Sequence, residues 1–107
     1  MVEVDLSKIT LSAIETRHGS LRDSIRRTPA LALETPWITT ALGGGSVVLK
    51  LECFQHTGTF KARGALSNVR AIPAHRQSAG ITAASAGNHA IAAAWAARAA
   101  GLSAKVV

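Results

Sequence analysis

In the second half of the chain, the spacing of apolar residues switches between two periods, which predicts strands separated by helices. Val47 to Glu52 is β-branched and apolar, with Lys50 and Glu52 on one side of an alternating pattern, so we expect a strand there. After Phe60 the apolar residues take helical spacing, and Pro73 should end that helix. The residues at this spacing are Ala62, Ala65, Leu66, Val69 and Ile72.

The last part of the chain repeats this order. Gly80 to Ala84 is expected to form a short buried strand, and Gly87 to Ala100 a largely buried, alanine-rich helix that stops at Gly101. Ala104 to Val107 then begins another strand. The alternation of strands and helices predicts an α/β fold with three layers, in which crossover helices connect the strands of a parallel sheet. Because both faces of such a sheet need covering, we expect this sheet to be incomplete.

The first half has a weaker pattern. A helix is expected within Leu6 to Arg26, with Gly19 as a point where it could break, and Thr28-Pro29 should end it. Leu31 to Leu42 fits more than one type of element. Gly43-Gly44-Gly45 predicts a flexible turn and not a phosphate loop, because no Lys-Ser/Thr pair follows it.

Composition narrows the class of protein. The chain has 107 residues, of which 48% are hydrophobic, and a net charge of +6. Its basic residues are scattered and its four aromatic residues are far apart, which does not fit a nucleic-acid surface. The chain has no apolar run long enough for a bilayer, and its first ten residues do not resemble a secretory signal, so we expect a cytoplasmic protein without membrane contact. The single cysteine, Cys53, cannot form an internal disulfide.

The segment from Leu51 to Ala65, LECFQHTGTFKARGA, places Lys61 in the first turn of a predicted helix, after the small-residue loop Thr57 to Thr59. Unpaired N–H groups and the positive end of the helix dipole lie near such an amine. Both disfavour the ammonium form, as burial would, and Schiff-base chemistry requires a neutral amine. For a lone lysine, a solvated surface position is the more common situation.

The same segment resembles the cofactor-lysine signature of the fold-type II pyridoxal-phosphate enzymes, the tryptophan synthase β superfamily. The most similar form is T-G-S-F-K-x-R-G-A, found in threonine dehydratases and serine racemases. Here Thr59 replaces the serine and keeps its hydroxyl, and Ala62 stands where cysteine and threonine synthases usually carry an acid. The resemblance implies that Lys61 binds pyridoxal 5'-phosphate, that Phe60 packs against its ring, and that residues 1–107 are the N-terminal portion of a catalytic domain.

A second motif, Ser85-Ala86-Gly87-Asn88-His89, lies between a predicted strand and the following helix. Free N–H groups at such a turn favour an anion, although Ser85 or Asn88 could instead only cap the helix. The segment resembles S-x-G-N-H, the second signature of the family. This resemblance implies that Asn88 binds the phenolic oxygen of the cofactor and that the turn from Ser85 to His89 receives the substrate carboxylate. Arg27-Thr28-Pro29 and the K-x-E of Lys50 to Glu52 also match the family.

Ala86 distinguishes two activities within this branch. Serine racemases usually carry a second serine at this position, and racemisation needs a proton donor on each face of the substrate, whereas elimination can use the lysine alone. The resemblance therefore implies a dehydratase that converts L-threonine or L-serine to a 2-oxo acid and ammonia, and a homo-oligomer when complete. His18, His56 and His75 do not form metal-ligand spacing with one another or with Cys53, so we expect no metal site. A racemase-like or other fold-type II enzyme, or a truncated non-catalytic fragment, is the alternative. Ile91 departs from the glutamine common in the family.

Two other residues have a structural interpretation. Arg63 is expected to pair with a carboxylate elsewhere in the chain. Trp95 is expected to lie in the core.

The glycine-rich phosphate loop of the family lies later in the sequence than the residues present here.

Overall fold

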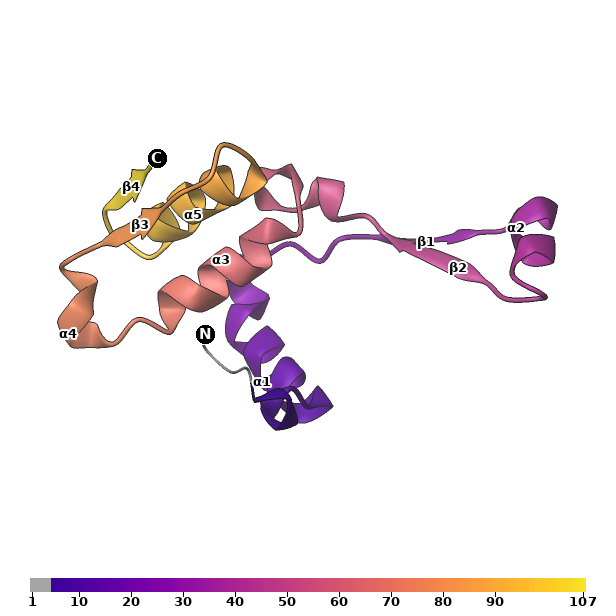
Figure 1. The fold of residues 1–107 in the computed structure, drawn as a ribbon, viewed down its shortest axis with the longest axis horizontal. Coiled ribbons are helices and arrows are strands. Elements are labelled where there is room, and N and C mark those ends of the chain that lie inside the picture. The colour runs from indigo at the N-terminus through magenta and orange to yellow at the C-terminus, as the bar shows by residue number, and fades with distance from the viewer. Residues whose placement is uncertain (1–4) are drawn as a thin grey trace.

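The computed structural model describes residues 5–107 and has extents of 54 × 31 × 30 Å. A body of helices with a small parallel sheet lies at one end, and a two-stranded arm extends from it (Figure 1). Residues 1–4, part of the stretch expected not to be a secretory signal, lie outside the described residues. Within residues 5–107 no helix has both the length and the apolar character needed to cross a membrane.

Helices and strands are interspersed along the chain. The helices are α1 (Leu11–Leu21), α2 (Pro36–Ala41), α3 (Lys61–Arg70), α4 (Ala74–Gln77) and α5 (Asn88–Ala99). The strands are β1 (Ala30–Leu33), β2 (Val47–Lys50), β3 (Ile81–Ala83) and β4 (Ala104–Val106). Short 3-10 turns occur at η1 (Leu6–Lys8), η2 (Arg22–Ser24), η3 (Glu52–Phe54) and η4 (His56–Gly58).

The parallel pair confirms the expected α/β class. Strands β3 and β4 are hydrogen-bonded in parallel, with Ile81 opposite Ala104 and Ala83 opposite Val106. Helix α5 connects them and packs on both, so it is the crossover helix that a parallel pair requires. It ends before Gly101, whose φ of +70° suits the left-handed conformation that often follows a helix.

The strand expected over Val47 to Glu52 was wrongly assigned to this sheet. It ends at Lys50, and β2 pairs antiparallel with β1 instead, with Ala30 opposite Lys50 and Leu33 opposite Val47. Because β1 lies only a short distance earlier in the chain, a local connection can close this antiparallel pair without a crossover. The connection consists of α2 and the turn at Gly43 and Gly44, so the ambiguous segment Leu31 to Leu42 forms a strand end followed by a helix.

Helix α1 does not break at Gly19. It runs from Leu11 to Leu21, and the Thr10 hydroxyl caps it by accepting a hydrogen bond from the Ala13 N–H at 3.1 Å. A glycine inside a helix costs only about 1 kcal/mol, which the remaining helical hydrogen bonds can offset. The helical region closes with η2 at Ser24, before Thr28-Pro29 as expected.

The core lies between α3, α5 and the end of α1. Its buried members are Leu21, Ala65, Leu66, Val69, Ala92 and Ala96. Only one face of α5 is buried, and Ile91 on another face is 56% exposed, so the expectation of a largely buried helix holds for that face alone. Strand β3, expected to be buried, is half-exposed, because α5 is the helix that covers the pair within residues 5–107.

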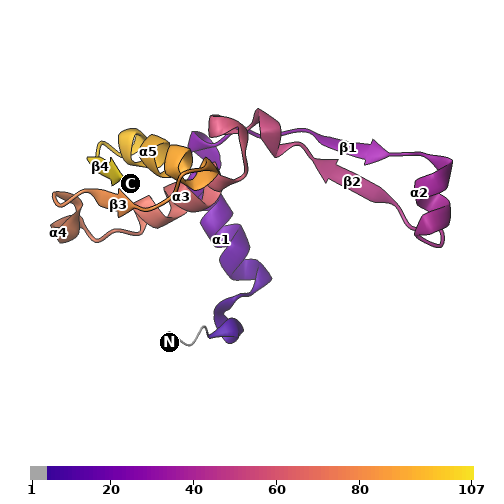
Figure 2. The same ribbon diagram turned by 45° about the horizontal axis from the view of Figure 1, so that its top comes forward.

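The arm is formed by β1, α2 and β2. Figure 2 shows it leaving the body as a separate extension, with α2 at its tip. Leu31, Trp37 and Val48 on the arm are all more than half exposed, whereas Ile38 in α2 is buried.

Candidate active site

Lys61 is the first residue of α3, as the sequence predicted. The chain reaches it through a tight loop in which both Thr57 (φ 64°) and Gly58 (φ 73°) have positive φ. A β-branched residue rarely adopts this conformation, so the surrounding contacts must hold Thr57 there. The Lys61 N–H donates to Thr59 Oγ1 at 3.3 Å, which gives one first-turn donor a partner.

The Lys61 amine is accessible. Its side chain is exposed, and Nζ lies 5.2 Å from the centroid of the Phe60 ring, which is itself 61% exposed. The expectation that burial would act on this amine is therefore not met within residues 5–107. The position at the helix start and the neighbouring aromatic face are both present.

Gln55 anchors the loop before Lys61, and sequence reasoning did not single it out. Its side chain is 1% exposed and makes two reciprocal hydrogen bonds with the backbone of Arg26: Arg26 N–H donates to Oε1 at 2.9 Å, and Nε2 donates to the Arg26 carbonyl at 2.8 Å. Oε1 also accepts from the His56 N–H at 3.0 Å. A buried amide satisfied in this way fixes the loop against a segment distant in sequence.

Arg63 pairs with a carboxylate, and the partner is Glu52. Its Nε donates to Glu52 Oε2 and its Nη2 to Oε1, both at 2.7 Å, and the Thr28 hydroxyl donates to Oε1 at 2.5 Å. These hydrogen bonds, first of all that from Arg63, lower the pKa of Glu52 from 4.5 to about 2, while the pKa of Arg63 is raised by the same pairing. The bidentate pair ties the first turn of α3 to the segment before it.

His56 and Trp95 form a further contact that the sequence did not predict. Their rings stack with centroids 4.9 Å apart and an interplanar angle of 20°. Trp95 packs against the core cluster, so its structural interpretation is confirmed. The stack attaches η4 to the face of α5, and it therefore links the loop before Lys61 to the second motif's helix.

The second motif lies where the sequence placed it, between β3 and α5. Asn88 is the first residue of α5, and neither Ser85 nor Asn88 caps the helix: the cap position is Gly87, and the Ser85 hydroxyl accepts from the Gly87 N–H at 3.2 Å. Within residues 5–107 the N–H groups of Asn88 and His89 have no hydrogen-bond partner. The turn therefore presents free donors at the positive end of a 12-residue helix.

The fold brings the two motifs to the same end of the body. Helices α3 and α5 pack against each other and run in the same direction, so Lys61 and Asn88 begin neighbouring helices (Figures 1 and 2). Ala86, Gly87 and Asn88 are exposed, as is Lys61. His89 is turned to another side of α5, where it lines a cavity of about 250 Å³ together with residues of α3 and β3.

This arrangement can hold an aldehyde cofactor with an anionic substrate. An accessible amine and an aromatic ring lie at one helix start, and unpartnered N–H donors lie at the next. The residues therefore fit a group that condenses with an amine and binds beside helix N-termini. The fold and the site therefore define the class of this chain: it is part of an α/β enzyme that uses a lysine.

Comparison with known proteins gives the family. The family model described as "Pyridoxal-phosphate dependent enzyme" matches residues 21–107, and the chain belongs to this family. It is 42% identical over 108 residues to phenylserine dehydratase of Ralstonia pickettii, covering 100% of this chain and 32% of that protein. It is 38% identical over 99 residues to a catabolic L-threonine dehydratase of Staphylococcus aureus, covering 92% of this chain and 28% of that protein.

A solved structure is also similar. The chain matches maize serine racemase with a TM-score of 0.76 and 32% identity, over 90% of this chain and 29% of that one. The chain thus spans about a third of the length of the curated relatives it matches. The expected resemblance to fold-type II pyridoxal-phosphate enzymes is confirmed.

Proposed function

We propose that residues 1–107 are the N-terminal, lysine-bearing portion of the catalytic domain of a pyridoxal-phosphate-dependent dehydratase. The complete enzyme would convert a β-hydroxy-α-amino acid, L-threonine or L-serine, to a 2-oxo acid and ammonia. One observation carries this proposal: α3 and α5 pack side by side in the same direction, and an accessible lysine lies at the start of α3 while a turn of free N–H donors lies at the start of α5. The dehydratase relatives support it, and one of them is named for the aryl substrate phenylserine.

Each motif residue has a role in this proposal. The Lys61 Nζ would hold the cofactor and later take the proton from the substrate α-carbon. Phe60 would pack against the cofactor ring, and the Asn88 amide would donate to its phenolic oxygen. The turn from Ser85 to His89, with Ala86 and Gly87 between them, would bind the substrate carboxylate through its free N–H groups. When bound, pyridoxal phosphate supplies an aldehyde for the amine and a conjugated ring that accepts electron density.

The loop before Lys61 would orient the amine. Gln55 and the Glu52–Arg63 pair attach that loop and the first turn of α3 to the segment around Arg26 and Thr28. A lysine that transfers a proton needs a defined direction of approach, and fixed backbone on both sides of it provides this. These residues are therefore positioning residues in the proposal.

The test is substitution of the lysine in the complete protein. Lys61→Ala should abolish both the visible absorbance of the bound cofactor and turnover, whereas Lys105→Ala, an exposed lysine on β4, should preserve both. Borohydride reduction followed by peptide mapping should place the label on Lys61. A label on another side chain, or full turnover in Lys61→Ala, would contradict the proposal.

The second candidate is a racemase, because maize serine racemase has a similar structure. Ala86 opposes it, since a methyl group cannot donate a proton to the face opposite the lysine. Product analysis with L-threonine, L-serine and D-serine separates the two: a 2-oxo acid indicates elimination, and an inverted amino acid indicates racemisation. Absence of cofactor absorbance at saturating pyridoxal phosphate would indicate the non-catalytic alternative. Homo-oligomerisation and a cytoplasmic location stay predictions.

A further inference from the structure

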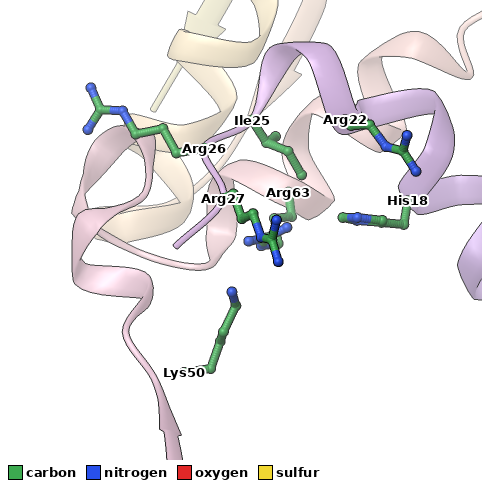
Figure 3. A pocket seen from close by; sticks show the side chains of 7 residues that line it. All are labelled: His18, Arg22, Ile25, Arg26, Arg27, Lys50 and Arg63. Atoms are coloured by element: carbon green, nitrogen blue, oxygen red, sulfur yellow. The ribbon is translucent and has the colours of Figure 1, made fainter. Parts of the chain in front are cut away.

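A cavity of about 640 Å³ lies beside α3, where Arg63 contributes to its lining. It is lined by His18, Arg22, Ile25, Arg26, Arg27, Lys50 and Arg63 (Figure 3). These residues come from α1, η2, the segment before β1, the end of β2 and α3. Neither Lys61 nor Asn88 lines it, and the cavity shares only the positioning residue Arg63 with the pairs described at the candidate active site.

The lining is strongly cationic. Five of the seven residues are arginine or lysine, and none carries a carboxylate. Arginine and lysine side chains that share one concavity repel one another, and this repulsion is relieved when an anion enters. The volume lies within the range of roughly 300–1,000 Å³ that small-molecule sites occupy.

Part of this charge is already engaged by the protein. Arg63 is paired with Glu52, and the Lys50 ammonium donates to the Thr28 carbonyl. The Arg26 guanidinium donates to the Phe54 carbonyl at 3.2 Å, and in Figure 3 it points away from the other side chains. The positive charges of these three residues therefore already interact, partly or wholly, with other groups of the protein.

Arg22 and Arg27 are different. Within residues 5–107 neither guanidinium has an ion-pair or hydrogen-bond partner, and both are exposed. In Figure 3 the Arg27 side chain extends toward Lys50, and Arg22 lies beside His18. A guanidinium offers a planar fork of donors that matches phosphate and carboxylate oxygens, so two arginines without protein partners are suitable ligands for an oxyanion.

We infer that this cavity binds a small multivalent oxyanion, a phosphate- or carboxylate-bearing molecule, with Arg22 and Arg27 as its principal ligands. Lys50, whose ammonium also donates to the Thr28 carbonyl, adds positive potential, and Ile25 supplies an apolar surface. Such a site needs no contribution from the cofactor. It does not depend on the proposed dehydratase activity.

The experiment is calorimetric titration of the complete, cofactor-loaded protein with inorganic pyrophosphate, and separately with citrate, at constant ionic strength. Saturable binding of either probe is expected, and which probe binds more tightly distinguishes phosphate from carboxylate chemistry. The double variant Arg22→Gln/Arg27→Gln should weaken that binding by about ten-fold or more, because two charge-assisted ligands are lost. The matched control Arg76→Gln/Arg98→Gln removes two exposed arginines outside the cavity and should bind as the unmodified protein does.

Two results would overturn the inference. One is the absence of saturable binding of both probes, which would mean that the cavity is not available to a free anion in the complete protein. The other is equal weakening in the Arg22/Arg27 and Arg76/Arg98 variants, which would indicate general charge attraction and no site. Retained cofactor absorbance in the Arg22/Arg27 variant shows that it is folded, so lost binding cannot be attributed to unfolding.

Discussion

The body and the arm use their apolar residues in opposite ways. In the body, Leu66, Ala92 and Ala96 are at most 1% exposed, and α3 packs on α5. On the arm, Trp37 is 71% and Val48 62% exposed, and the antiparallel pair β1–β2 has no layer packed on it within residues 5–107. Stability is therefore concentrated in the body, and opening of the arm should require less free energy.

Both motifs of the candidate site belong to the body. Lys61 begins α3 and Asn88 begins α5, so the packing of these two helices in the core also fixes the distance between the two residues. The arm is joined to this region through Lys50, which reaches the Thr28 carbonyl, and through Glu52. Substitutions in the body, at this junction and on the arm should therefore have decreasing effects on stability.

The largest effect is expected in the core. Leu66→Ala should lower the free energy of unfolding by about 2–5 kcal/mol, because it leaves a cavity between α3 and α5. Urea unfolding followed by circular dichroism measures this change. The control is Leu49→Ala on β2, where the side chain is 39% exposed and the loss should stay below about 1 kcal/mol. Equal losses at the two leucines would contradict the unequal distribution of stability.

A second pair compares glycines of the two regions. A Cβ on Gly80, before β3, would lie 2.2 Å from Ser103 Oγ and 2.6 Å from the Ser103 carbonyl oxygen, and its φ is +70°. Gly80→Ala should therefore cost about 2–3 kcal/mol, from backbone strain and displacement of β4. Gly43 on the arm has a φ of +57° with nothing within 4 Å, so Gly43→Ala should cost only the conformational term of about 1 kcal/mol. Thermal unfolding measures both losses of stability. A larger loss for Gly43→Ala than for Gly80→Ala would show that the arm turn is more tightly held than its contacts indicate.

The third prediction concerns the junction. Glu52→Gln should destabilise the protein by about 1–2 kcal/mol at neutral pH, because it removes the charged acceptor of Arg63 and Thr28. The pKa of Glu52 is lowered from 4.5 to about 2, so its contribution is fully present above pH 4.5 and is lost as the pH falls toward 2. Urea midpoints at several pH values measure this loss.

The control for this prediction is Glu34→Gln, on an exposed residue just after β1. It should change stability by less than about 0.5 kcal/mol. The unmodified protein and Glu52→Gln should converge in stability at low pH. A constant difference between them down to pH 2 would assign the effect to packing and not to the carboxylate.

The body was largely predictable because its signals are local. Helical spacing after Phe60, the turn before Asn88 and the glycine after α5 each define an element through neighbouring residues, and both motif positions followed from them. The Arg63 pairing was also expected, although the identity of its partner was not. Glu52 lies 11 residues earlier, and no periodic pattern connects the two.

The arm and the loop contacts were not predictable for the opposite reason. The partner of β2 depends on a short connection through α2, and the apolar pattern of β2 fits either sheet. Gln55 and the His56–Trp95 stack join segments that are far apart in sequence. Gln55 looks like any loop glutamine until the fold buries it against the backbone of Arg26.

The smallest effect is expected at the arm tip. Trp37→Ala should change the free energy of unfolding by less than about 0.5 kcal/mol, because the side chain is 71% exposed. Trp95→Ala should cost several times more, since it removes the stack on His56 and a contact with the core. Residues 1–107 contain two tryptophans, so within this part of the protein each variant leaves one fluorescent reporter, in the body or on the arm. In Trp95→Ala the remaining reporter is Trp37 on the arm, and in Trp37→Ala it is Trp95 in the body. The urea midpoint of the Trp37 emission should be lower than that of the Trp95 emission, by more than the difference in stability between the two variants explains. Equal midpoints after correction for that difference would mean that arm and body unfold as one unit.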